Sequence, residues 1–215
     1  MNSLTIFIFE LVVLIFSVMI HEISHGYVAE RLGDTTARDA GRLTLNPIKH
    51  IDPFGSIILP ALLAIPALFG APTILFGWAK PVPFNPWNLK NPKTGAGKIG
   101  AAGPLSNFLL ALVFGLFIRG ALWLGVLPDA PIILLFGLVA YVNISLGVFN
   151  LVPIPPLDGS KVLIAFLPHA EWSASLINFL EKNGMMLVLL FIFFGFSLIS
   201  PIIRALFTLF TGQVF

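Results

Sequence analysis

The sequence predicts an all-α polytopic membrane protein with about four to five transmembrane helices and a re-entrant, partly extended hairpin element. Of its 215 residues, 57% are hydrophobic and 10% are charged, and the mean hydropathy is +0.97. Soluble domains carry roughly 25% charged residues, so lipid must solvate much of this surface. Four segments are apolar over the ~20 residues that a spanning helix needs. A fifth apolar segment is interrupted by prolines.

The four candidate spans are Leu4–Ala29, Ile99–Leu122, Ile132–Leu151 and Met185–Phe207. The apolar stretch Leu4–Ile20 could be mistaken for a secretion signal, but it lacks a basic start and a small-residue cleavage site. We therefore expect it to be retained as the first membrane helix. We also expect residues 1–215 to form a single membrane-embedded domain.

The fifth apolar segment, Ile57–Gly77, contains Pro60, Pro66 and Pro72. Each proline removes a backbone donor and interrupts a helix. Irregular backbone is tolerated at membrane depth only where protein or a water-filled cavity satisfies its polar groups. The segment is therefore predicted to enter the membrane and return on the same side.

Basic residues on both sides of this segment support its return. Four precede it and four follow it, namely Arg31, Arg38, Arg42 and Lys49, and then Lys80, Lys90, Lys93 and Lys98. If the segment returns, these eight share one face with Lys161 and Lys182, and the other face holds Arg119 and Arg204. Basic loops favour the cytoplasm. We expect a multi-pass protein of the cell membrane with both termini outside.

Composition also limits the chemistry. The chain has no cysteine, so metal ligands must come from histidine, aspartate and glutamate. Its net charge is only +2, and the topology explains its basic residues without a nucleic-acid partner.

The first span ends in His21-Glu22-Ile23-Ser24-His25, an H-E-x-x-H pattern. Side chains four apart lie on one face of a helix, so both imidazoles can bind one metal ion. Glu22 would then lie beside the metal, where it can take a proton from water. A chance match at a helix end is the alternative, although ionisable groups there are costly without a partner.

Catalytic zinc sites normally have three protein ligands, and Asp158 is the best candidate for the third. It lies among prolines and apolar residues just after a span, unlike His50 and His169, which lie in polar connections. If Ile57–Gly77 returns, Asp158 reaches the same side of the membrane as His25. The alternative for Asp158 is a turn residue, because Asp-Gly is a common turn pair.

These motifs together resemble the site-2 protease family of intramembrane zinc metalloproteases, in its compact form without a PDZ domain. The resemblance is carried by His21–His25, by Leu157-Asp158-Gly159 preceded by Asn150, by Gly103–Asn107 at the opening of another span, and by Gly77–Pro86. It covers most of the chain, from the first span to Lys161.

The resemblance implies one zinc ion held by His21, His25 and Asp158, with Glu22 as general base and then general acid. It also implies that Asn150 helps to hold the substrate carbonyl or its oxyanion. The alternative for Asn150 is a helix-terminal cap. Asn107 would be either a partner of a metal ligand or an interhelical hydrogen-bonding residue.

Residues Trp78–Asn85 include Pro81-Val82-Pro83, which favours extended backbone. Such a segment could pair with an unwound substrate by β-augmentation, or it could seal the site.

The sequence thus predicts hydrolysis of a peptide bond in or near a transmembrane segment of a membrane protein, close to the cytoplasmic face. A transporter or metal permease is the main alternative, because broken helices and intramembrane His and Asp residues also occur there. A transport site has no need of Glu22 between the two histidines. An inactive homologue serving as a scaffold is a second alternative, which the intact motif disfavours.

Overall fold

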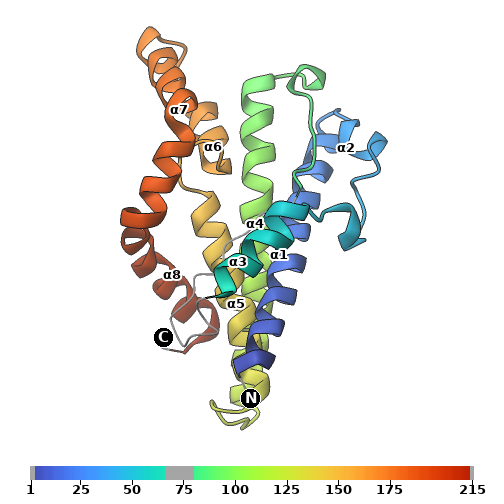
Figure 1. Cartoon of the computed structure of the whole chain (residues 1–215), viewed down its shortest axis with the longest axis vertical. Helices are drawn as coiled ribbons and strands as arrows, with labels where there is room; N and C mark the ends of the chain where they lie inside the picture. The colour runs from blue at the N-terminus through green and yellow to red at the C-terminus, as the bar shows by residue number, and fades with distance from the viewer. Residues whose placement is uncertain (1–2, 66–79, 214–215) are drawn as a thin grey trace.

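A computed structural model describes residues 3–65 and 80–213 of the chain (Figure 1). Within these residues the protein consists of helices and loops, with no strand, so the predicted all-α class is confirmed. Figure 1 shows long helices lying lengthwise beside one another, with α1 and α5 rising from the end where the N-terminus lies.

Four helical segments among the described residues are long and apolar enough to cross a membrane. They are α1 (Ser3–Arg31), α4 (Pro92–Trp123), α5 (Pro131–Asn150) and the continuous helix Glu171–Thr211. The last comprises α7 (Glu171–Leu190), the π-helical turn η5 (Phe191–Gly195) and α8 (Phe196–Thr211). All four predicted spans are therefore present as helices.

Two of these helices begin earlier than the sequence indicates. The fourth span was expected from Met185, but its helix starts at Glu171 and runs through the polar residues 181–183. The second was expected from Ile99, but α4 starts at Pro92, where Asn91 accepts a hydrogen bond from the Thr94 N–H. Hydropathy marks only the part of a helix that lies in lipid, whereas capping groups decide where the helix begins.

A related correction concerns Gly103-Pro104. This pair was expected to open a span, but it lies inside α4, about three turns after its start. Pro104 removes the N–H that would otherwise bond to the Gly100 carbonyl, and proline is tolerated inside a membrane helix because neighbouring groups can satisfy the freed carbonyl.

The core lies where α4, α5 and α8 pack together. Its centre is formed by buried apolar residues of these helices, namely Ala111, Ala140, Ile144, Val148, Ile199, Ile203 and Phe207. Small residues allow the backbones to approach closely, since a Cβ on Gly115 of α4 would lie 2.7 Å from the Phe210 carbonyl oxygen. On its other side, α4 packs against α1 and the short helix α6 (Asp158–Phe166).

The two flanks of the proline-rich segment lie together. The Lys80 N–H donates to the His50 carbonyl at 2.9 Å. The buried Arg42 guanidinium joins the same flanks by donating to the carbonyls of Lys49, Lys80 and Pro81. The start of the segment forms η2 (Pro53–Ile58) and α3 (Leu59–Ala64). Of the predicted Ile57–Gly77 element, residues 66–77 lie outside the described part of the chain.

Candidate active site

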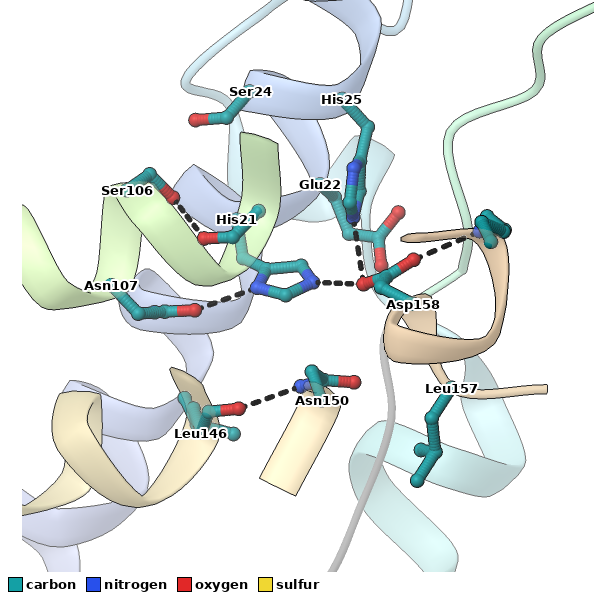
Figure 2. A network of polar contacts seen from close by, with 12 residues as sticks. His21, Glu22, Ser24, His25, Ser106, Asn107, Leu146, Asn150, Leu157 and Asp158 are labelled. Carbon is teal, nitrogen blue, oxygen red and sulfur yellow. Dashed lines mark hydrogen bonds and ion pairs between the residues drawn. The ribbon is translucent and has the colours of Figure 1, made fainter. Parts of the chain in front are cut away.

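Helix α1 carries His21, Glu22 and His25, whose side chains lie close to Asp158 (Figure 2). The histidines are one helical turn apart, and their ring centroids are 4.7 Å apart. They are 4% and 7% exposed, and Glu22 is half-buried beside them. One potential ligand atom from each of the three residues lies within 4.8 Å of the others, which is close enough for one metal ion.

Asp158, the first residue of α6, reaches the same point from far along the chain (Figure 2). Its Oδ2 atom lies 3.0 Å from His21 Nε2 and 3.1 Å from His25 Nε2. Gly159 makes this position possible, because a Cβ there would lie 2.1 Å from the Leu151 carbonyl oxygen. The first turn of α6 can therefore pack directly against the end of α5.

The far sides of both imidazoles are held by acceptors. His25 Nδ1 lies 2.6 Å from the Ile99 carbonyl oxygen, and His21 Nδ1 lies 2.6 Å from Asn107 Oδ1. The orientation of the Asn107 amide follows from its Nδ2, which donates to Asn143 Oδ1 at 2.9 Å. Each Nδ1 therefore carries a hydrogen, and both Nε2 lone pairs of the neutral rings face the Asp158 carboxylate.

This donor arrangement fits a divalent cation. Two imidazole lone pairs and one carboxylate oxygen that face one another repel unless positive charge lies between them. Neutral imidazole and carboxylate are common zinc ligands. The ring nitrogen of an imidazole that does not bind the metal usually donates to a protein acceptor, as Nδ1 of both histidines does here. His50 and His169 do not line this cavity, and His50 Nε2 instead donates to the Thr44 carbonyl.

A buried polar network extends from His21 across three helices. Asn107 on α4 bonds to Asn143 on α5, and Asn143 Nδ2 donates to Ser17 Oγ on α1 at 2.9 Å. Asn107 thus fills both roles considered for it, as an interhelical hydrogen-bonding residue and as a partner of His21. Ser17 was missed by the sequence reasoning, although it lies one turn before His21 on the same helix.

The backbone of α4 approaches the histidines closely at Gly103. A Cβ there would lie 2.5 Å from the Nε2 atoms of both His21 and His25. Only glycine leaves room for the imidazoles at this crossing of α1 and α4. The sequence reasoning noted Gly103 as part of a motif but did not find this contact.

A cavity of about 150 Å³ opens beside these groups. It is lined by His21, Glu22, His25, Pro81, Val82, Phe84, Ile99, Asn150, Pro156, Asp158 and Lys161. Glu22 Oε2 accepts a hydrogen bond from the Val82 N–H at 2.9 Å. Asn150 Nδ2 donates to the Leu146 carbonyl at 3.0 Å, so it bonds to the last turn of α5 and also faces the cavity.

The electrostatics of the site keep Asp158 ionised. Burial alone would raise its pKa, but Nε2–H donors on His21 and His25 when those rings are protonated, together with the positive charge of Lys161, hold the pKa of Asp158 well below its usual range. Lys161 Nζ lies 2.8 Å from Asp158 Oδ1. The sequence reasoning used Lys161 only as a topological charge.

Known proteins are similar to this chain in sequence. The sequence pattern of peptidase family M50 matches residues 121–195. YwhC of Bacillus subtilis, designated a candidate zinc metalloprotease, is 39% identical over 161 residues, which is 73% of this chain and 68% of YwhC. Rip2 of Mycolicibacterium smegmatis, with the same designation, is 29% identical over 210 residues, which is 91% of this chain and 76% of Rip2. No solved structure gives a significant match.

Membrane-spanning helices around an H-E-x-x-H motif define the class of a multi-pass membrane metallopeptidase. The chain belongs to the site-2 protease family, peptidase family M50, whose members are zinc metalloendopeptidases that act on proteins. The family, the enzyme class and the metal predicted from the sequence are confirmed at this level.

Proposed function

We propose that the chain is an intramembrane zinc metalloprotease that hydrolyses peptide bonds in or near transmembrane segments of membrane proteins. The observation that carries this proposal is the convergence of His21 Nε2, His25 Nε2 and Asp158 Oδ2 beside the Glu22 carboxylate. These groups line a cavity that has room for water, in a helix bundle suited to lipid.

In this proposal His21, His25 and Asp158 hold one Zn²⁺ ion. When bound, zinc polarises a carbonyl group and lowers the pKa of water enough to supply a nucleophile at neutral pH. The Nδ1 bonds to Asn107 and to the Ile99 carbonyl keep both imidazoles in the tautomer that can coordinate.

Glu22 acts as the general base and then as the general acid. Its Oε2 is held by the Val82 N–H, which leaves the other carboxylate oxygen to accept a proton from the attacking water. The same carboxyl then donates this proton to the leaving amine. Asn150 keeps one amide hydrogen beyond its bond to Leu146, and we assign that donor to the substrate carbonyl or its oxyanion.

Residues 80–83 are better suited to sealing the cavity than to pairing with substrate. Val82 has the only N–H between Lys80 and Phe84, because prolines flank it, and that N–H is bonded to Glu22. The carbonyls of Lys80 and Pro81 accept hydrogen bonds from Arg42. These bonds and the two prolines leave the segment few backbone groups with which a substrate strand could pair.

We place the site near the cytoplasmic face. The backbone bond between Lys80 and His50 brings both basic flanks of the proline-rich segment to one end of the bundle, the end at which α6 lies (Figure 1). Basic loops favour the cytoplasm. Reporters inserted at Trp87 and fused after Phe215 should lie on opposite sides of the membrane, and a shared side would contradict this topology.

The catalytic proposal is tested with purified protein in detergent and a panel of single-span peptides. Glu22→Gln should keep its zinc but lose about 10²–10⁴-fold in cleavage rate, the usual contribution of a general base. Glu30→Gln is the matched control, because Glu30 lies on the same helix and pairs with Arg38 outside the cavity. Removal of zinc by a chelator should abolish cleavage, and added zinc should restore it.

Unchanged cleavage by Glu22→Gln protein would refute this mechanism. Zinc-dependent transport in vesicles, without any peptide cleavage, would instead favour the permease. A protein that binds zinc and cleaves no peptide would favour the scaffold.

A further inference from the structure

Lys161 contacts the oxygen of Asp158 that faces away from the histidines. Asp158 Oδ2 points at both Nε2 atoms, whereas Oδ1 lies 2.8 Å from Lys161 Nζ. The Asp158 side chain is only 8% exposed. Among the described residues, Lys161 is the one hydrogen-bond partner of this oxygen.

The way in which Asp158 binds a metal ion decides whether water can bind it as well. A catalytic zinc site has three protein ligands and keeps a fourth position open. A carboxylate can coordinate through one oxygen or through both. If both Asp158 oxygens coordinated together with the two imidazoles, the protein would supply four donor atoms, which is the full number of ligands of a tetrahedral zinc ion.

We infer that Lys161 is a positioning residue that holds Asp158 as a one-oxygen ligand and thereby keeps one coordination position of the zinc open for water. The inference rests on the proposed zinc site. Lys161 acts through Asp158 and has no part in the proton transfers assigned to Glu22.

The protein holds Lys161 in place from several sides. Residues 158 and 161 are one turn apart on α6, so the ammonium group can reach the carboxylate. The ammonium also lies 5.7 Å from the ring centroid of Phe84, within the range of a cation–π contact. At its base, the Lys161 Cβ packs against α4, where a Cβ on Gly100 would lie 2.9 Å away.

Two readouts on the whole chain in detergent test this role. The first is metal affinity together with coordination number, and the second is the kinetics of peptide cleavage. Coordination number is read from the visible spectrum of the Co²⁺-loaded protein and from X-ray absorption at the zinc edge. Lys161→Met keeps the aliphatic stem and removes the charge, and Lys161→Arg keeps the charge. Lys182→Met is the matched control, because Lys182 is exposed on α7 and does not line the cavity.

Lys161→Met should bind zinc at least as tightly as the wild type, because Oδ1 becomes free to coordinate. Its Co²⁺ spectrum should change to that of a site in which the protein supplies all four ligand atoms. Its kcat should fall by about 10–100-fold, the usual effect of losing the partner of a metal ligand, while KM changes little. Lys161→Arg should restore the wild-type spectrum and most of the kcat, and Lys182→Met should match the wild type throughout.

A fall in zinc affinity parallel to the fall in kcat, with an unchanged Co²⁺ spectrum, would overturn the inference, as would an unchanged kcat. If Lys161→Met protein does not fold, Lys161→Gln is judged by the same readouts. A wild-type protein that neither binds zinc nor cleaves peptides would refute the proposed function itself. An active wild type with an equally active Lys161→Met variant refutes the role of Lys161 alone.

Discussion

Replacing Asn107 by alanine tests whether the buried polar network positions the metal ligand His21. The substitution removes the acceptor of the 2.6 Å bond from His21 Nδ1 and the donor to Asn143 Oδ1. Both polar groups would then be buried without these partners, since His21 is 4% exposed and Asn143 is fully buried.

The expected magnitude follows from these two lost bonds. Loss of the hydrogen-bond partner of a metal ligand typically lowers metal affinity by about 10–100-fold, which corresponds to about 1.4–2.7 kcal/mol. A buried unsatisfied group costs about 1–3 kcal/mol, so the metal-free protein should also lose stability in this range. Because the tautomer of His21 is no longer fixed, metal binding should weaken beyond what the lost stability explains.

Zinc affinity is measured by competition with a coloured chelator at constant neutral pH. Asn183→Ala provides the control, because Asn183 on α7 does not line the cavity and its amide donates to the Phe179 carbonyl within its own helix. If Asn107→Ala and Asn183→Ala proteins bound zinc with equal affinity, the network would have no role in holding His21.

Gly103→Ala should abolish zinc binding and cleavage, because its Cβ would lie 2.5 Å from Nε2 of both His21 and His25. Gly120→Ala on the same helix is the control. Its Cβ would meet nothing within 4 Å, so this variant should be neutral or slightly more stable in thermal unfolding. Asp34 is a second test: burial raises its pKa, but hydrogen bonds from Thr36, Asn85 and Asn88 outweigh this and hold the pKa of Asp34 below its usual value. The resulting stability is present above the unfolded pKa of about 3.9 and is lost as pH falls through the lower folded pKa. Asp34→Asn should therefore lower Tm at pH 7 by a margin that shrinks below about pH 4, and a margin independent of pH would show that the carboxylate charge contributes nothing.

Much of the site could be predicted because it depends on the spacing of residues along a single helix. Four-residue spacing on a helix places His21 and His25 on one face whatever surrounds them. The order of the spans and the basic residues predict that Asp158 lies on the same side of the membrane as the histidines, but they do not give its distance from them. The structure supplies that distance and adds Lys161, which the sequence offered only as one charge among twelve basic residues.

By itself, the sequence determined the helical class, the four membrane spans and the chemical identity of the groups that meet at the site, since hydropathy and helical periodicity act along neighbouring residues. The tertiary structure alone decided that the His21 imidazole bonds to Asn107, that Gly103 lies against both histidines, and that the two Asp158 oxygens face different partners. These contacts depend on how far each helix is rotated about its axis and how closely the axes approach. Such quantities arise from packing between segments as distant as residues 21 and 158, and no local pattern encodes them.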